Sequence, residues 1–126
     1  MLTLARVIQH LSEGEDFNLC CPAFLDGFYA ADQSSRFSLI RDEPEPFDNV
    51  GHFFYCDVAA IAHKLANDYG LPIPEWVHRP EYVFSEPYYP IWDKSNEVLK
   101  EYLRSVSPPE FAMRNIFVEP NTLSRV

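Results

Sequence analysis

Residues 71–92, which are rich in proline and in aromatic side chains, limit the possible folds of this chain more than any other stretch. They hold five of the eleven prolines and six Trp, Tyr or Phe side chains. Because proline has no amide N–H, such a stretch forms neither a long helix nor a central strand. Its aromatic side chains supply burial that regular hydrogen bonding does not. We therefore predict an extended strap across the surface of a helical bundle, with one helical turn near residues 80–84.

Apolar residues recur three and four positions apart through most of the remaining chain, which is the spacing of one face of a helix. The longest such stretch, residues 48–70, has Asp48 as its expected N-cap and Gly70 at its expected end. No stretch alternates convincingly with the two-residue period of a half-buried strand. The other helices are expected over residues 3–13, from Pro22 onward, from Ser34 or Ser35 to Arg41, over 93–105 and over 107–115.

These patterns predict a single all-α domain over residues 1–126. It is a compact bundle of five to six helices around a long central helix at 48–70, with the aromatic and proline-rich strap at 71–92. A chain of 126 residues, 47% of them hydrophobic, is large enough to fold without a metal or a disulfide. We expect no cofactor.

The chain is acidic, with a formal net charge of −9. Residues 1–63 carry ten carboxylates against three arginines, whereas residues 64–126 carry nine against seven basic side chains. The scarcity of Lys and Arg disfavours nucleic-acid binding, which depends on neutralising phosphates. A negative half-surface keeps a protein soluble and can also steer a basic partner toward it, and both interpretations stay open here.

Three cysteines, Cys20, Cys21 and Cys56, form a poor disulfide framework because their number is odd and two of them are adjacent. We expect reduced thiols in a cytoplasmic protein. The N-terminus lacks the features of a signal peptide, and no apolar run reaches the ~20 residues that cross a membrane. Cys20 and Cys21 precede an expected helix start, where thiol pKa values fall, but no local signature supplies a base, so a structural role is favoured.

His52, Cys56 and His63 share one face of the predicted central helix. The first two are four residues apart, a usable ligand spacing for zinc, but His63 is about 10 Å further along the helix axis. One ion cannot contact all three, so a site would need other ligands such as His10 or Cys20. We predict no metal site, and His52 and Cys56 are the candidates if that prediction fails.

Two regions are candidate partner-binding surfaces: the strap, because Trp and Tyr dominate interface hot spots, and the acidic loop before the central helix. The alternative is that every aromatic side chain of the strap packs inward. We expect Trp76 to be buried as an anchor, and at least one of Tyr88 and Tyr89 to be exposed, because adjacent residues of an extended segment point to opposite sides. The candidate residues are Trp76, Tyr82, Tyr88, Tyr89 and Trp92 in the strap and Asp42, Glu43 and Glu45 in the loop.

Three segments carry a resemblance: Leu71-Pro-Ile-Pro-Glu-Trp-Val77, E-P-Y-Y-P at 86–90 and R-N-I-F-V at 114–118. Together they resemble a widespread group of small bacterial proteins, a domain of unknown function, with a P-x-W segment, an E-P-W-F-like segment and a terminal F-R-R-R-N-I-F-V. Phe24-Leu-Asp-Gly-Phe-Tyr29 and Arg36 are similar to that group's earlier landmarks. Where the group has consecutive arginines, this chain has Ala112, Met113 and Arg114, which argues against a basic cluster there. The resemblance implies a bacterial antitoxin-like or accessory protein.

The sequence contains no phosphate-binding glycine loop and no G-x-S-x-G, H-E-x-x-H or C-x-x-C motif. We therefore predict a non-enzymatic bacterial interaction protein that binds a partner protein, as an antitoxin-like neutraliser of a basic partner or as an accessory subunit. Two alternatives stay open. One is a metal- or thiol-dependent enzyme that uses the His52/Cys56 face or Cys20/Cys21, and the other is a nucleic-acid-binding regulator. A homo-oligomer is compatible with the sequence.

Overall fold

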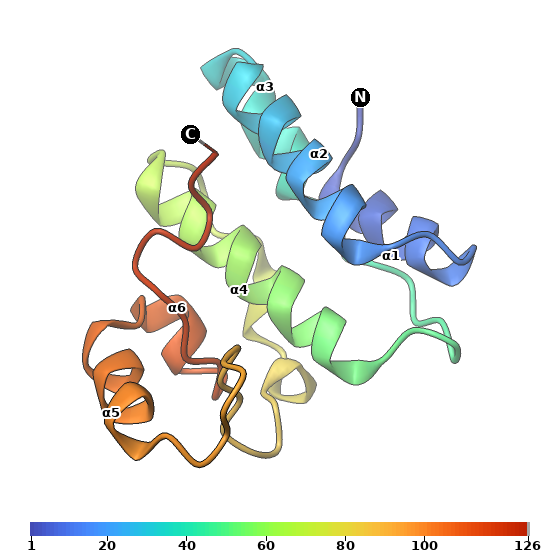
Figure 1. Ribbon diagram of the computed structural model, residues 1–126. Helices are drawn as coiled ribbons and strands as arrows, with labels where there is room; N and C mark the ends of the chain where they lie inside the picture. Colours follow the sequence, from blue (N-terminus) through green and yellow to red (C-terminus); the bar gives the residue numbers. More distant parts are fainter. Residues whose placement is uncertain (126) are drawn as a thin grey trace.

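Helices make up the regular structure of the chain in this computed structural model, which describes residues 1–125 (Figure 1). Two 3-10 turns, η1 (Glu75–His78) and η2 (Pro80–Tyr82), lie in the strap. Extended pairing within residues 1–125 is limited to an isolated bridge between Tyr88 and Ile116. The all-α prediction is confirmed. The α-helices are α1 (Leu4–Ser12), α2 (Phe17–Ala30), α3 (Gln33–Ile40), α4 (His52–Asp68), α5 (Glu97–Val106) and α6 (Pro109–Ala112).

The helix α4 lies between two groups of elements (Figure 1). On one side α1 packs against it, and α2 and α3 pack in turn against α1. On the other side α6, η1 and η2 pack against it. Because α4 is enclosed by both groups, it is apolar on most of its circumference and forms the centre of the bundle, as predicted. Its side chains with no exposed surface are Cys56, Val58, Ala59, Ala60, Ala62, Leu65 and Ala66.

Aromatic rings join α2 to α4 at both ends, so the two helices run side by side in the same direction. At their N-terminal ends the ring centroids of Phe17 and Phe54 are 5.1 Å apart. At their C-terminal ends the centroids of Phe28 and Tyr69 are 5.4 Å apart. Between these two bridges α2 packs against α1 rather than closely against α4. The space left there becomes the site described below.

The helix α2 begins at Phe17, five residues before the predicted start, and Pro22 lies inside it. The earlier start is explained by Asp16, an N-cap residue whose carboxylate accepts a hydrogen bond from the Asn18 amide at 2.9 Å. Proline is tolerated at Pro22 at a cost, because it has no N–H to donate. The carbonyl of Asn18, four residues earlier, therefore lacks its usual helical donor.

The helix α4 begins at His52 rather than directly after Asp48, the predicted N-cap. Asp48 lies in a turn that Tyr55 holds in place, since the Tyr55 hydroxyl accepts a hydrogen bond from the Phe47 amide at 2.7 Å. This turn keeps Asp48 away from the helix end. Gly70 does end the helix as predicted, with a φ of +65° that glycine adopts without strain.

The helices near the C-terminus are shorter than predicted. The helix α5 begins at Glu97 rather than at 93, because the side chain of Asn96 caps it by accepting a hydrogen bond from the Leu99 amide at 3.0 Å. The helix α6 ends at Ala112 rather than near Asn115, and Asn115 has a left-handed backbone with a φ of +65°. The chain then turns back toward the strap.

The strap follows the prediction in its first half. Trp76 is buried, and its indole N–H donates a hydrogen bond to the Arg41 carbonyl at 3.1 Å. In its second half the strap lies beside the segment after α6. The Tyr88 amide donates to the Asn115 carbonyl at 2.8 Å, and the Phe117 amide donates to the Tyr88 carbonyl at 2.9 Å. These bonds fix one side of the site.

Candidate functional site

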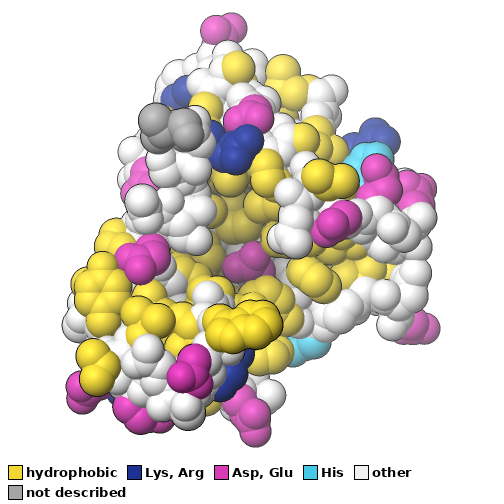
Figure 2. Space-filling model, in the orientation of Figure 1, with side chains coloured by type: hydrophobic (Ala, Val, Ile, Leu, Met, Phe, Trp, Pro, Cys, Tyr) yellow, Lys and Arg dark blue, Asp and Glu magenta, His cyan; other side chains and the backbone are white. Residues whose placement is uncertain are grey.

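An open groove of about 750 Å³ lies between α2 and α4, where the two helices are held apart. Figure 2 shows this face of the molecule hollowed at its centre, with hydrophobic side chains around an acidic one. The strap and α6 border the groove beyond α4, and residues 122–125 lie along it. That terminal segment is held by the Tyr29 hydroxyl, which donates to the Leu123 carbonyl at 2.7 Å, and by an ion pair of Arg125 with Asp26 at 3.0 Å.

Aromatic rings form much of the groove's wall at the N-terminal ends of α2 and α4. Phe53 is the centre of this cluster, with its ring centroid 4.3 Å from that of Tyr88 and 5.8 Å from that of Phe54. Phe54 in turn contacts Phe17 of α2. These rings are only partly buried, so the groove presents aromatic surface to whatever enters it.

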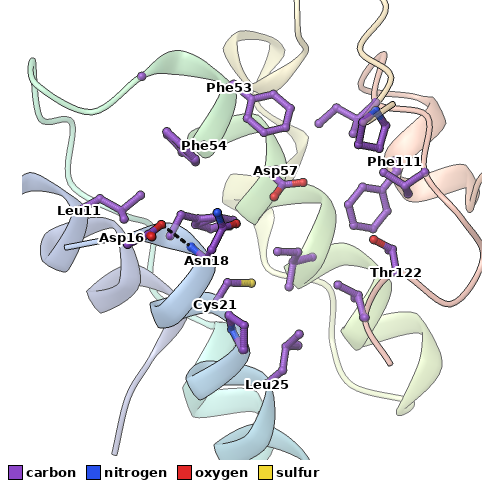
Figure 3. Close-up of a pocket in the computed structure, with 18 of the residues that line it drawn as sticks. Leu11, Asp16, Asn18, Cys21, Leu25, Phe53, Phe54, Asp57, Phe111 and Thr122 are labelled. Atoms are coloured by element: carbon purple, nitrogen blue, oxygen red, sulfur yellow. Dashed lines mark hydrogen bonds between the residues drawn. The ribbon is translucent and has the colours of Figure 1, made fainter. Parts of the chain in front are cut away.

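Asp57 extends from α4 into the groove (Figure 3). No hydrogen bond or ion pair joins its carboxylate to another residue in the range 1–125. The surrounding protein strips water from the carboxylate, and this burial raises the pKa of Asp57 to about 7 from an ordinary value of 3.8. A carboxyl group with a pKa shifted this far, in a cleft, marks a candidate functional site.

The other charged groups along the groove are mostly acidic. Glu15 and Asp16 lie at its α1–α2 end, and the carbonyl of Asn18 lacks its helical donor because of Pro22. The one basic side chain among the lining residues is Arg125, and it is already paired with a carboxylate outside the groove. The groove therefore favours a positively charged ligand group over a negatively charged one.

The thiols are not activated. Cys21 lines the groove, and burial raises its pKa to about 12. Burial is also the largest cause that raises the pKa of Cys20, followed by the negative charge of Glu15. Each of these shifts keeps the thiol protonated at neutral pH, which is the unreactive form. The thiol chemistry that the sequence leaves open has no activating group in this geometry.

The His52/Cys56 pair does come together, with 3.4 Å between His52 Nε2 and Cys56 Sγ. His63 lies elsewhere, with its Nδ1 3.3 Å from Nη1 of the buried Arg114. Burial lowers the pKa of His63, and the Arg114 charge lowers it further. Arg114 is itself tied to the strap by a 2.7 Å hydrogen bond to the Val77 carbonyl, so the pair connects α4, α6 and η1. As predicted from the helix spacing, the three side chains do not converge.

A different grouping of potential metal ligands occurs at the end of α1. Ligand atoms of His10, Glu13 and Glu15 all lie within 4.8 Å of one another, and within residues 1–125 it is the one such grouping of three or more. His10 is partly buried and the two carboxylates are exposed. His10 and Glu15 also form a hydrogen bond with each other, and this local contact accounts for the grouping without a metal ion.

The tyrosines of the strap differ from the expectation that Tyr88 or Tyr89 would be exposed. They do point to opposite sides, but both sides are covered. Tyr88 is partly buried in the groove wall. Tyr89 is buried on the other side, where its ring stacks on Phe117 at 5.2 Å between centroids and its hydroxyl accepts a hydrogen bond from Arg104 at 2.6 Å. The chain segment after α6, which pairs with the strap, provides this second cover.

The other two candidates of the strap, Tyr82 and Trp92, differ in their exposure to solvent. Tyr82 is buried with Trp76, whereas the Trp92 side chain is 100% exposed. In the acidic loop, Glu43 accepts a hydrogen bond from the Tyr82 hydroxyl at 2.6 Å and forms an ion pair with Arg79 at 2.9 Å. The other two loop candidates, Asp42 and Glu45, are exposed.

Asp57 is the residue that the sequence analysis missed. It is the one charged side chain between residues 52 and 63, a stretch that is otherwise apolar apart from its histidines. A carboxylate in the middle of a helix that is buried on nearly every side needs either a partner or a cavity. A lone Asp in an otherwise apolar stretch of the central helix is therefore a sequence signal for a cavity or a binding site.

The fold and the groove define a small all-α domain with an aromatic-walled, acidic groove between two parallel helices. Comparison with protein-family models, with curated proteins and with solved structures finds no match to this chain. Among the described residues no helix has the length and apolar character needed to span a bilayer.

Proposed function

We propose that the chain is a non-enzymatic bacterial interaction protein that binds a segment of a partner protein in the groove between α2 and α4. The observation that supports this proposal is the combination of the groove's partly exposed aromatic wall with Asp57, a carboxylate that has no partner within residues 1–125. Aromatic side chains dominate the energetics of protein interfaces, and an apolar groove between helices is a common receptor for a peptide segment.

The size and shape of the groove favour a peptide segment. A volume of about 750 Å³ lies within the range of binding sites for small molecules and for a few side chains. The groove is open rather than enclosed, and it extends from the start of α2 to the C-terminal segment (Figure 3). An open groove accepts a chain that continues beyond it at both ends.

A binding role is favoured over thiol chemistry because Cys21, the thiol that lines the groove, is protonated. Asp57 is the one carboxyl group lining the groove whose pKa is strongly shifted. Nucleophilic catalysis by a thiol needs a base positioned to activate it, and no hydrogen bond joins the Cys21 thiol to a base within residues 1–125. Binding is favoured over nucleic-acid recognition because Glu15, Asp16 and Asp57 would repel phosphates. The partner is therefore proposed to be a protein, in keeping with an antitoxin-like or accessory role in the cytoplasm.

The test is a selection of random peptides displayed on phage against the purified chain, followed by affinity measurements with two variants of α2. Asn18 is exposed and lines the groove, so Asn18→Trp fills the groove from its wall. Leu19 is 72% exposed and is not among the lining residues, so Leu19→Trp is the matched control on the same helix turn. Thermal melts confirm that both variants fold.

We expect selected peptides to bind wild type and Leu19→Trp equally and to bind Asn18→Trp about tenfold or more weakly, a loss of about 1.4 kcal/mol. Peptides that do not distinguish the two variants would bind elsewhere on the surface. In that case the groove is not the binding site and the proposal is wrong.

A further inference from the structure

We infer that the groove receives a lysine or arginine side chain of the partner protein, with its cationic end at Asp57 and its stem against the aromatic wall. This inference rests on the proposed function. It specifies which chemical group of the partner contacts Asp57 in the groove. Three features of the groove support it independently: the position of the carboxylate oxygens, the charges around them and the composition of the walls.

The oxygens of Asp57 face the space of the groove. Among residues 1–125, every side-chain nitrogen or oxygen that is closed off from solvent has a hydrogen-bond partner. Asp57 has no such partner, so its oxygens are not closed off, although the residue is only partly exposed. They are therefore free to accept hydrogen bonds from a group that enters the groove. An ammonium or guanidinium group donates several hydrogen bonds and accepts none, which matches this need.

The charges around Asp57 select for a cation. Asp16 adds negative charge at one end of the groove, where Glu15 is hydrogen-bonded to His10. At the other end Arg125 does not compensate Asp57, because its guanidinium pairs with Asp26 through Nε at 3.0 Å and Nη2 at 3.3 Å. A cation that enters the groove thus meets a partly buried carboxylate, with which an ion pair is stronger than on the open surface.

The walls suit a long apolar stem with a charged end. The rings of Phe53, Phe54 and Tyr88 form a connected surface on the α4 side. Aromatic faces attract cations, and the methylene stems of Lys and Arg pack well on apolar surface. On the facing wall Asn18 is exposed and lines the groove, and its side-chain amide carries a neutral acceptor oxygen.

A divalent metal ion fits the groove less well than a cationic side chain. Ca²⁺ and Mg²⁺ require several oxygen ligands. Within residues 1–125 the grouping of three close potential ligands is His10, Glu13 and Glu15, which does not include Asp57. The groove is also much larger than one ammonium group, so the neighbouring residues of a partner segment would occupy the rest.

The test combines an amine with peptides. The n-butylammonium ion reproduces the stem and ammonium group of a lysine side chain, and 1-butanol is its neutral counterpart. Each is titrated into wild type, Asp57→Asn and Asp32→Asn while amide NMR shifts of the groove residues are followed. Asp57→Asn keeps the shape and removes the charge. Asp32 is exposed, makes no capping hydrogen bond and lies outside the groove, so Asp32→Asn controls for net charge.

We expect n-butylammonium to shift the groove residues saturably in wild type and in Asp32→Asn, with about tenfold weaker binding to Asp57→Asn. 1-Butanol should bind wild type and Asp57→Asn equally. For the peptides selected as described above, replacing the critical Lys or Arg by norleucine should weaken binding to wild type about tenfold. The same replacement should have no further effect on binding to Asp57→Asn, because the two changes remove the same interaction.

Two outcomes would overturn the inference, and they separate it from the proposed function. If groove-dependent peptides bind Asp57→Asn as tightly as wild type, the groove still binds a partner segment but not through a cation. If n-butylammonium binds in an Asp57-dependent manner while no groove-dependent peptide is found, the groove is a site for a small amine. The proposed function then fails together with the protein side chain that we infer.

Discussion

Two carboxylates beside aromatic rings, Glu43 and Asp57, have opposite surroundings in this protein. Glu43 accepts a hydrogen bond from Tyr82 and pairs with Arg79, so it holds the acidic loop to the strap. Asp57 lies in the groove without a partner among residues 1–125, and its pKa is raised to about 7. A carboxylate with partners is explained by the fold, whereas one without them costs free energy in the unbound protein. The contrast separates the structural role of Glu43 from the binding role that we propose for Asp57.

The strongest effect is expected at the anchor of the structural region. Trp76 is buried, with its ring edge-on to Tyr82 at 5.9 Å and its N–H bonded to the main chain after α3. Trp76→Ala should lower the free energy of unfolding by about 3–5 kcal/mol, as for other large buried aromatic residues. Urea unfolding followed by circular dichroism measures it. A loss below about 1 kcal/mol would show that the strap is not anchored there.

Asp57→Asn should instead raise the free energy of unfolding of the unbound protein, by about 1–2 kcal/mol at pH 8. This gain is smaller than the full pKa shift implies, because water in the open groove screens the charge. The pKa of Asp57 is raised on folding, from 3.8 to about 7. The stability due to this group is therefore fully present below pH 3.8 and is lost as the pH rises through about 7.

The measurement for Asp57 is the difference in unfolding free energy between wild type and Asp57→Asn across this pH range. The difference should grow from pH 4 to pH 8 in favour of the variant. Asp32→Asn, which removes an exposed carboxylate outside the groove, controls for the change in net charge. A flat difference would mean that Asp57 is well solvated, and the contrast with Glu43 would disappear.

Glu43→Gln should destabilise the protein, by about 0.5–1 kcal/mol, because it weakens an ion pair with a half-exposed arginine and a hydrogen bond to Tyr82. The loss should shrink in an Arg79→Ala background, since the ion pair is already absent there. A double-mutant cycle of Glu43→Gln and Arg79→Ala in 0.1 M and 1 M salt measures the coupling energy between the two side chains. Stabilisation by Glu43→Gln would place Glu43 in the same class as Asp57.

The smallest effect is expected at Trp92, whose side chain is fully exposed. Trp92→Ala should change the free energy of unfolding by no more than about 0.5 kcal/mol. Because Trp92 is in water and Trp76 is buried, iodide should quench only part of the intrinsic fluorescence of wild type and almost none in Trp92→Ala. Full quenching of wild type would contradict the buried anchor.

The helical architecture could be predicted from the sequence because its signals are local. Gly70 ends α4, and the apolar spacing around Leu4, Val7 and Ile8 defines α1. The predicted start of α2 at Pro22 was wrong because Asp16 caps the helix earlier, and a helix tolerates Pro22 in its interior at the cost of one hydrogen bond. The groove could not be predicted. It depends on how far apart two helices lie, which is set by Phe17–Phe54 and Phe28–Tyr69 contacts between distant positions.

The terminal segment along the groove has a consequence for the order of folding. Leu123 and Arg125 are bound to Tyr29 and Asp26, residues 94 and 99 positions earlier in the chain. Closing loops of that length costs entropy that only a nearly complete bundle repays, so this segment docks late. The groove wall formed by residues 122–125 is therefore completed only after Tyr29 and Asp26 have taken their places in the bundle. If the groove binds a partner segment as we propose, binding would also report that this late contact has formed.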